Sequence, residues 1–306
     1  MEQEQVGQRK LAAGTGLVSG RYRDIFLLLF LGALWGSSYL FIKITVTEVP
    51  ATTLVIGRLG LAAGIMWLIL LVTRQRIPTD RKVWGAFAGM GFLSGAVPWT
   101  LITWGEQYIS SGLAALLQAT MPIFTLILAV LLSDDERLTP LKVLGVVIGF
   151  VGVGILMLPD LREGLQASFL GQLAIIASSL SYAAGAVFAR KWLRGQPPML
   201  STTGQLTTGL LFMLPLGLLS GQPFHGAPSL PAIASWLALT VLGTVVAYII
   251  YYKLIQSSSA TFVSTVTYII PVYGLFLGAL VLNEPLTANL MASLALILLG
   301  ILLVRK

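Results

Sequence analysis

The chain has 306 residues, of which 56% are hydrophobic and only 10% are charged. Soluble domains carry about 25% charged residues, so the composition excludes an ordinary soluble protein and predicts an all-α integral membrane protein. The absence of cysteine excludes a disulfide framework and a cysteine metal site, and a net charge of +7 carried in short loops is typical of membrane topology rather than of nucleic-acid binding.

Apolar stretches of about 20 residues recur along the chain, and a helix of that length crosses the core of a bilayer. Ten such helices are expected, at residues 24–43, 51–73, 84–106, 111–132, 140–158, 168–190, 199–220, 231–253, 260–282 and 286–304. With residues 1–23 as a cytoplasmic tail, every Lys and Arg except Lys43, Arg58 and Arg162 falls in a cytoplasmic segment. Because positive charge concentrates on that side of the membrane, both termini are predicted to be cytoplasmic.

A pattern in the middle of the chain returns near its end. Residues 118–157 and 267–304 each hold an early proline, then an acid (Glu136 or Glu284), then Leu-Thr and a second apolar stretch. At offsets of 147–149 residues the correspondence extends to the whole chain, so that Arg58 matches Gln205 and Trp99 matches Tyr248. This divides the chain into five-helix repeats at 24–160 and 161–306. Since five is odd, the second repeat must lie inverted, as in many secondary transporters.

Several short motifs carry a family resemblance that covers nearly all of the chain after residue 24. They are Leu34-Trp35-Gly36-Ser37-Ser38 with Lys43, the Gly57-Arg58 pair, Pro122 followed by Glu136-Arg137-Leu138-Thr139, and Pro271 followed by Glu284-Pro285-Leu286-Thr287. In this order they resemble the EamA family of the drug/metabolite transporter superfamily. Asp134 and Asp135 lengthen the first acidic loop beyond the family's usual form.

The resemblance implies a ten-helix secondary transporter of the bacterial inner membrane that works by alternating access. Within the family the sequence is most similar to exporters of aromatic amino acids, so export of aromatic or hydrophobic amino acids and related metabolites is expected. The alternative is a multidrug or organic-cation efflux transporter, or another small-metabolite permease of the superfamily. We expect a small-molecule substrate and the lipid bilayer as partners, no nucleic acid, and a monomer.

Aromatic and polar residues that lie away from the helix ends predict a cavity between the two repeats. Trp and Tyr combine an apolar face with a polar edge, so they suit an aromatic amino acid or, through cation–π attraction, a flat organic cation. The same side chains are equally suited to plain packing. The cavity is expected between helices one, three, four, six, eight and nine, at Trp35, Ser38, Trp99, Gln118, Ser178, Tyr182, Gln205, Tyr248, Thr267 and Tyr268.

Two prolines lie at matching places inside the fourth and ninth expected helices. Pro122 and Pro271 each remove a helical hydrogen bond and clash with the preceding turn. Broken helices at equivalent places in two repeats are typical of transporter binding sites. They are therefore predicted to be hinges, with static kinks as the alternative.

Three charged residues are candidates for a functional role. Arg58 lies within the second expected helix, where it is expected either to bind a substrate carboxylate or to pair with an acid, and Lys43 is expected to anchor the first helix. Glu106 is a candidate for proton exchange, but water or a pairing with Arg58 or Lys43 is the expected environment. Because no acid or histidine lies at mid-membrane, weak or absent proton coupling is expected, and the organic-cation alternative is disfavoured.

The remaining functional classes fit the sequence poorly. An intramembrane enzyme needs a buried nucleophile and base or a metal site, and the sequence offers no buried Cys, His or acid pair for either. We expect no enzymatic activity, no metal and no cofactor. A channel would carry a ring of charges or a filter-like run of carbonyl groups, and neither is visible in the sequence.

Overall fold

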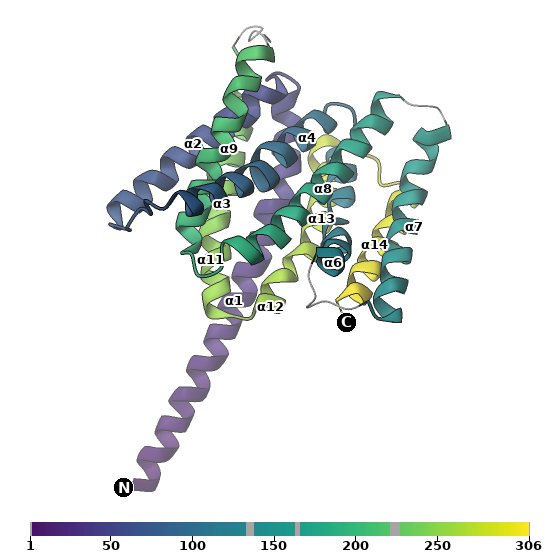
Figure 1. Cartoon of the computed structure of the whole chain (residues 1–306). Coiled ribbons are helices and arrows are strands. Elements are labelled where there is room, and N and C mark those ends of the chain that lie inside the picture. Colours follow the sequence, from purple (N-terminus) through teal and green to yellow (C-terminus); the bar gives the residue numbers. More distant parts are fainter. Residues whose placement is uncertain (1, 133–137, 163–165, 221–226, 306) are drawn as a thin grey trace.

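The computed structural model describes residues 2–132, 138–162, 166–220 and 227–305, and every regular element among them is a helix (Figure 1). The elements are α1 (Glu2–Val46), α2 (Ala51–Val72), α3 (Arg81–Gly91), η1 (Phe92–Ala96), α4 (Val97–Gly105), α5 (Ser111–Gln118), α6 (Met121–Leu132), α7 (Pro140–Arg162), α8 (Ala167–Trp192), α9 (Pro198–Ser220), α10 (Leu230–Thr240), η2 (Val241–Val246), α11 (Ala247–Ser257), α12 (Ala260–Ser264), α13 (Val266–Leu282) and α14 (Ala288–Val304).

Nine helices in the described part of the chain are long and apolar enough to cross a membrane. They begin and end close to the first nine expected spans: the first runs over Tyr22–Val46 and the eighth, Leu230–Ser257, is the longest. The tenth expected span corresponds to α14, an apolar helix that is shorter, with 17 residues. The protein is therefore an all-helical membrane protein. The residues singled out in the first acidic loop, Asp134, Asp135, Glu136 and Arg137, lie outside the described residues.

The helices of the first half pack mainly against helices of the second half. The largest contacts join α7 to α14, α1 to α13, α2 to α9 and α4 to α8, and α7 and α14 run side by side at one edge of the bundle in Figure 1. The main hydrophobic core accordingly combines buried residues of both halves, such as Leu54 and Ile102 with Ile175 and Ile297. The two halves are thus interleaved rather than separate bodies.

Glycines bring α7 and α14 into backbone contact. The i, i+4 spacing of Gly145 and Gly149 predicts a close helix approach, because both lie on one face and carry no side chain. In the structure a Cβ atom at Gly145 would lie 2.7 Å from the carbonyl oxygen of Gly300, and one at Gly300 would lie 2.6 Å from the carbonyl oxygen of Gly145. The prediction of close packing is confirmed for this pair.

Two membrane helices contain a π-helical turn that the sequence did not predict. In the third span η1 connects α3 to α4, and in the eighth span η2 connects α10 to α11. Phe92 and Val241, the first residues of the two turns, are 149 residues apart, so the turns lie at matching places in the predicted repeats. A π-turn widens the helix and leaves carbonyl groups for other partners, and such turns are frequent at functional sites.

Both predicted hinge prolines follow an interruption of their helix. Pro122 is the second residue of α6, directly after the break between α5 and α6. The carbonyl oxygen of Gln118, four residues before this proline, accepts a 3.4 Å hydrogen bond from Ser179 Oγ. Pro271 lies inside α13, six residues after the break at Thr265. The breaks are at different distances from the two prolines, and a hinge motion stays a prediction.

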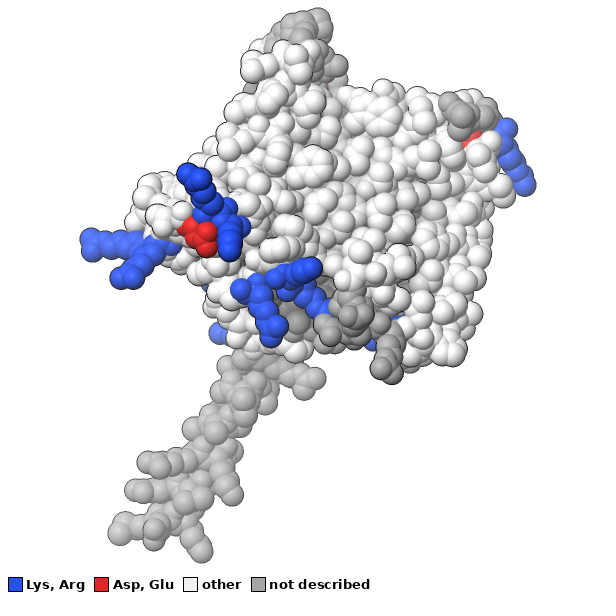
Figure 2. Space-filling view, viewed as in Figure 1, with Lys and Arg blue, Asp and Glu red and all other residues white. Residues whose placement is uncertain are grey.

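The outer surface is apolar over most of the bundle. Large side chains such as Leu68, Leu131 and Leu218 are exposed, as expected for helices that face lipid. Figure 2 shows that the Lys and Arg side chains visible from this side gather mainly toward the end of the bundle from which the N-terminal part of α1 emerges. The wide face above them is almost free of charge, which matches a belt in contact with hydrocarbon.

Candidate functional site

A buried arginine lies between helices of the two halves. Arg58 of α2 is only 7% exposed, and its Nε donates a 3.0 Å hydrogen bond to Thr244 Oγ1 in η2. The guanidinium carbon lies 3.8 Å from the ring centroid of Trp99 in α4, which is 3% exposed. An arginine over a tryptophan face is stabilised by cation–π attraction, and the attraction is strongest where water is excluded.

Tyrosines from three further helices surround this arginine. Tyr39 of α1, Tyr182 of α8 and Tyr248 of α11 all lie within electrostatic range of Arg58. Tyr248 also meets Trp35 of α1 edge to face, with 6.3 Å between ring centroids. The structure therefore brings three of the predicted cavity aromatics, Trp99, Tyr182 and Tyr248, near the predicted charged residue, and a fourth, Trp35, contacts Tyr248. Sequence reasoning missed Tyr39, although it follows Trp35 by four residues and so shares its helix face.

The predicted polar cavity residues form hydrogen bonds within and between helices of the bundle. Gln205 of α9 donates a 3.1 Å hydrogen bond from Nε2 to the carbonyl oxygen of Ser94 in η1. Gln118 accepts a hydrogen bond from Ser178 Oγ, which joins α5 to α8, and its own Nε2 is buried without a partner among the described residues. Ser38 Oγ donates to the carbonyl oxygen of Leu34, one turn earlier in α1.

Thr267 and Tyr268 belong to a different cluster. The terminal Nη2 of Arg305, just after α14, donates a 2.9 Å hydrogen bond to Thr267 Oγ1 and a 2.5 Å bond to the carbonyl oxygen of Ser264. The guanidinium group of Arg305 also lies 4.6 Å from the ring centroid of Tyr268. The structure thus places these two residues beside the end of α14, whereas Gln118, the repeat counterpart of Thr267, contacts α8.

The structure corrects the expected environment of Glu106. The Lys43 ammonium donates to two backbone carbonyl oxygens of the turn that follows α4, at 2.6 Å to Glu106 and 2.7 Å to Ile109. The Glu106 side chain is 0% exposed, so it does not face water. Neither of its carboxyl oxygens has a hydrogen-bond partner in the described part of the chain. The expected pairing of this carboxyl with Lys43 or Arg58 is therefore wrong.

Glu48, an acid in the loop after α1, is hydrogen-bonded to the residue that precedes α10. It accepts hydrogen bonds from Ser229, at 2.6 Å from the backbone N–H and 2.7 Å from Oγ. These hydrogen bonds lower the pKa of the Glu48 carboxyl below its ordinary value, since they favour the charged form. Glu48 thus links the loop after α1 to the start of α10.

Glu284, which follows α13, caps a helix of the other half. Its Oε1 accepts hydrogen bonds from the backbone N–H (2.7 Å) and Oγ (3.0 Å) of Ser111, and its Oε2 accepts one from the N–H of Gly112 (2.9 Å). These are the first residues of α5, whose N–H groups have no partner within the helix. A carboxylate here is favoured by both the hydrogen bonds and the helix dipole.

Removing this cap is expected to weaken the contact between the halves. We predict that Glu284→Ala lowers the stability of the folded protein by about 2 kcal/mol, the upper range for loss of a helix cap. Thermal unfolding of the detergent-purified protein would measure the effect as a lower midpoint, with Leu286→Ala, an exposed site two residues away, as control. An unchanged midpoint would show that the cap does not hold the halves together.

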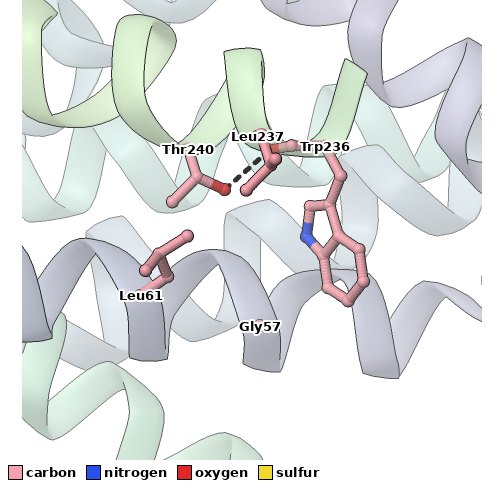
Figure 3. Close-up of a pocket in the computed structure, with 5 residues that line it drawn as sticks. All are labelled: Gly57, Leu61, Trp236, Leu237 and Thr240. Carbon is pink, nitrogen blue, oxygen red and sulfur yellow. Dashed lines mark hydrogen bonds between the residues drawn. The ribbon is translucent and has the colours of Figure 1, made fainter. Parts of the chain in front are cut away.

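A small cavity lies between α2 and α10 (Figure 3), and Arg58 is not among the residues that line it. It has a volume of about 210 Å³ and is lined by Gly57, Leu61, Trp236, Leu237 and Thr240. Thr240 Oγ1 donates to the carbonyl oxygen of Trp236, one turn earlier, so the lining offers little free hydrogen-bonding capacity. Leu61 and Leu237 are exposed on the lipid-facing surface. None of these five residues is among those predicted to line the substrate cavity.

Comparison with known proteins identifies the family. The model of the EamA-like transporter family matches residues 23–158 and again residues 169–306. The chain is 30% identical over 273 residues to a protein of Escherichia coli K12 described as the uncharacterized inner membrane transporter YedA, covering 89% of this chain and 87% of that one. It is 26% identical over 294 residues to a probable amino-acid metabolite efflux pump of Salmonella typhimurium, covering 91% and 93%.

A solved crystal structure has the same fold. It matches with a TM-score of 0.65 at 17% sequence identity, and the match covers 92% of this chain and 96% of the other. At this identity the likeness concerns the fold alone. The two family matches, the membrane helices and the relatives named as transporters agree with one another. The chain belongs to the EamA-like transporter family and is a multi-pass membrane transporter.

Proposed function

We propose that the protein is a secondary transporter of the bacterial inner membrane that exports aromatic or hydrophobic amino acids by alternating access. The observation that carries the proposal is the buried Arg58, stacked on Trp99 and within electrostatic range of three tyrosines, where helices of both halves meet. A cation suits the carboxylate of an amino acid, and the aromatic rings suit an apolar side chain. The relative named as an amino-acid metabolite efflux pump supports the same substrate class.

Matching contacts between the halves support the proposed ten-helix inverted repeat. Gly57 of α2 packs directly against the Trp236 ring of α10, and Gly204 of α9 packs in the same way against the Phe87 ring of α3. Gly204 follows Gly57 by 147 residues and Trp236 follows Phe87 by 149, which are the offsets of the repeat. Each contact is thus the counterpart of the other, with the two halves exchanged.

A second pair of contacts follows the same rule at the two π-turns. Ser38 of α1 packs on Gly243 of η2, where a Cβ atom would lie 2.7 Å from Ser38 Oγ. Gly185 of α8, which is 147 residues after Ser38, packs on Ser94 of η1, which is 149 residues before Gly243. In the first contact the serine is on α1 and the glycine on η2, and in the second the glycine is on α8 and the serine on η1. The two elements approach each other closely in both contacts.

The hydrogen bonds made to the two π-turns also match between the halves. Arg58 reaches η2 at Thr244, and its repeat counterpart Gln205 reaches η1 at Ser94. Two halves with matching contacts can exchange their conformations, so that a central site opens first to one side and then to the other. The proposal includes the π-turns in this exchange, since each accepts a hydrogen bond from the side chain that differs between the halves, Arg58 or Gln205.

The charge distribution supports cytoplasmic N- and C-termini. Basic side chains gather near the end of the bundle from which α1 emerges (Figure 2), as expected for the cytoplasmic side. In this arrangement residues 1–23 form the cytoplasmic tail, and the repeats span 24–160 and 161–306. The transporter is proposed to act as a monomer on a small-molecule substrate.

The proposal is tested by reconstituting the purified protein into liposomes and measuring uptake of radiolabelled tryptophan and phenylalanine. We expect uptake that saturates with substrate concentration and is competed by the unlabelled amino acid. Empty liposomes serve as control. Absence of saturable uptake for both amino acids, with the protein correctly folded, would overturn the substrate class.

Efflux of organic cations remains the second candidate, and one observation favours it. The sequence argument against it was the lack of a buried acid, but Glu106 is completely buried. An acid in such a place can exchange a proton for a cation, whereas Arg58 repels one. Uptake of a flat aromatic cation such as ethidium, driven by a pH gradient in the same liposomes, would support this candidate over amino-acid export.

A further inference from the structure

Among the residues that the structure describes, the Glu106 side chain is the buried one with two polar atoms that lack a hydrogen bond. It lies at the end of α4, is fully buried, and has no hydrogen bond to either oxygen among the described residues. A buried carboxylate without a partner is strongly disfavoured, so the group is held as the neutral acid unless a cation reaches it. A packed apolar residue would avoid this cost, which indicates that the carboxyl has a partner at another stage of the protein's work.

The neighbouring cations are not that partner in this conformation. The charged groups whose fields reach Glu106 are Lys43 of α1, Arg58 of α2 and Glu284 after α13, and the nearby titratable group is Tyr39 of α1. Lys43 is bonded to two backbone carbonyls, Glu284 caps α5, and no ion pair joins Arg58 to Glu106 in the described part of the chain. The acid and the arginine are thus close enough to interact electrostatically but do not touch.

Arg58 keeps hydrogen-bonding capacity on the edge of its guanidinium group. Among the described residues, its one hydrogen bond uses Nε, while its flat face is stacked on Trp99. The two terminal nitrogen atoms form the fork that binds a carboxylate with two parallel hydrogen bonds. A buried cation with a free edge and a buried acid with no partner among the described residues therefore both lie within electrostatic range of Tyr39.

We propose that Arg58 and Glu106 form the two poles of a binding site for the zwitterionic end of an α-amino acid. Resting on the proposed function, this assigns the substrate carboxylate to the Arg58 fork and the substrate ammonium to the Glu106 carboxylate. Trp99, which stacks on Arg58, and Tyr39, which is within electrostatic range of both poles, can contact the rest of the molecule. A zwitterion compensates both buried groups at once, whereas a ligand with one charge leaves the other group unpaired.

The same geometry couples transport to a proton. Without substrate the Glu106 carboxyl is protonated; when an ammonium group arrives, the O–H bond breaks, the proton leaves to water on the open side, and the ammonium N–H donates to the carboxylate. After the substrate dissociates on the other side, the carboxylate takes a proton from that side. Substrate and proton thus occupy the site in turn and cross the membrane in opposite directions.

The first test uses ligands that carry only one of the two charges. In binding assays with the purified protein, Glu106→Gln is expected to weaken tryptamine, an amine without a carboxylate, by about tenfold or more, and to leave indole-3-propionate, a carboxylate without an amine, within about threefold. Arg58→Gln is expected to do the reverse. Equal losses of both ligands in both variants would overturn the assignment of the poles, because a general packing defect acts without regard to charge.

The second test measures the proton. Tryptophan binding to the wild-type protein is expected to release a proton into a weakly buffered dye solution, and Glu106→Gln is expected to abolish this release. Glu48→Gln, which changes an exposed acid bonded to Ser229, is the matched control and should release the proton as wild type does. Proton release that persists in Glu106→Gln would overturn the inference while tryptophan binding itself still upheld the proposed function. Absence of any amino-acid binding by wild type would instead reject the proposed function.

Discussion

Replacing Arg58 with glutamine is expected to abolish amino-acid transport while the protein stays folded. The variant carries the residue that the other half has at the matching position, Gln205. It loses the charge and the double hydrogen bond available to a substrate carboxylate, so transport efficiency should fall about 100-fold. Uptake of labelled tryptophan into liposomes, normalised to reconstituted protein, measures the loss.

The fold should tolerate this change, because burying an arginine is costly in the first place. Thr244 Oγ1, the partner of Arg58 Nε, also donates its own hydrogen bond to the carbonyl oxygen of Leu239 and so stays satisfied. Losing the cation–π contact with Trp99 is destabilising, so it offsets part of the free energy gained when the charge is no longer buried. We expect the unfolding midpoint to change by less than about 3 °C. Transport that survives, or a protein that fails to fold, would contradict a substrate-binding role for Arg58.

Replacing Gly300 with valine is expected to produce the largest loss of folded protein. A Cβ atom at this position would lie 2.6 Å from the carbonyl oxygen of Gly145, and 2.8 and 2.9 Å from the backbone N and Cα of Gly149. All three atoms belong to the α7 backbone, so no side chain can move aside. α14 must then separate from α7, its principal neighbour, at a cost on the order of 3 kcal/mol.

The matched control is Gly154→Val on α7, since a Cβ atom there meets nothing within 4 Å. Both variants place the same β-branched side chain in a membrane helix, so helix propensity cancels between them. Size-exclusion chromatography and thermal unfolding in detergent should show aggregated or strongly destabilised protein for Gly300→Val alone. Equal behaviour of the two variants would contradict the close α7–α14 crossing.

The membrane helices could be predicted from sequence because their signal is local. Lipid requires long, apolar, self-bonded segments, and the expected spans agree with the helices to within a few residues at most ends. The π-turns could not be predicted in this way. The η1 sequence Phe92–Ala96 has no proline and the same small and apolar residues as ordinary helix, and the partners of its carbonyls, such as Gln205 and Ser181, are far away in sequence.

The candidate site could be predicted in part. Arg58 and the deep aromatic residues stood out because charges and Trp or Tyr are unusual inside apolar segments. The burial of Glu106 did not, since in sequence it lies at a helix end beside a polar loop. Its environment depends on Lys43 bonding to carbonyl groups instead of to the carboxyl, and that choice is made by tertiary structure. The contacts of Thr267 and Tyr268 depend on Arg305 in the same way.

In the proposed mechanism one substrate site opens to the two sides of the membrane in turn. Counterflow in liposomes tests it most directly: vesicles loaded with unlabelled phenylalanine are diluted into labelled tryptophan, and initial uptake is compared with that of unloaded vesicles. Alternating access predicts faster, saturable uptake into the loaded vesicles, because the inward-facing site returns with substrate bound. Uptake that rises linearly with concentration and is not accelerated by internal phenylalanine would indicate a continuous pore and contradict the account.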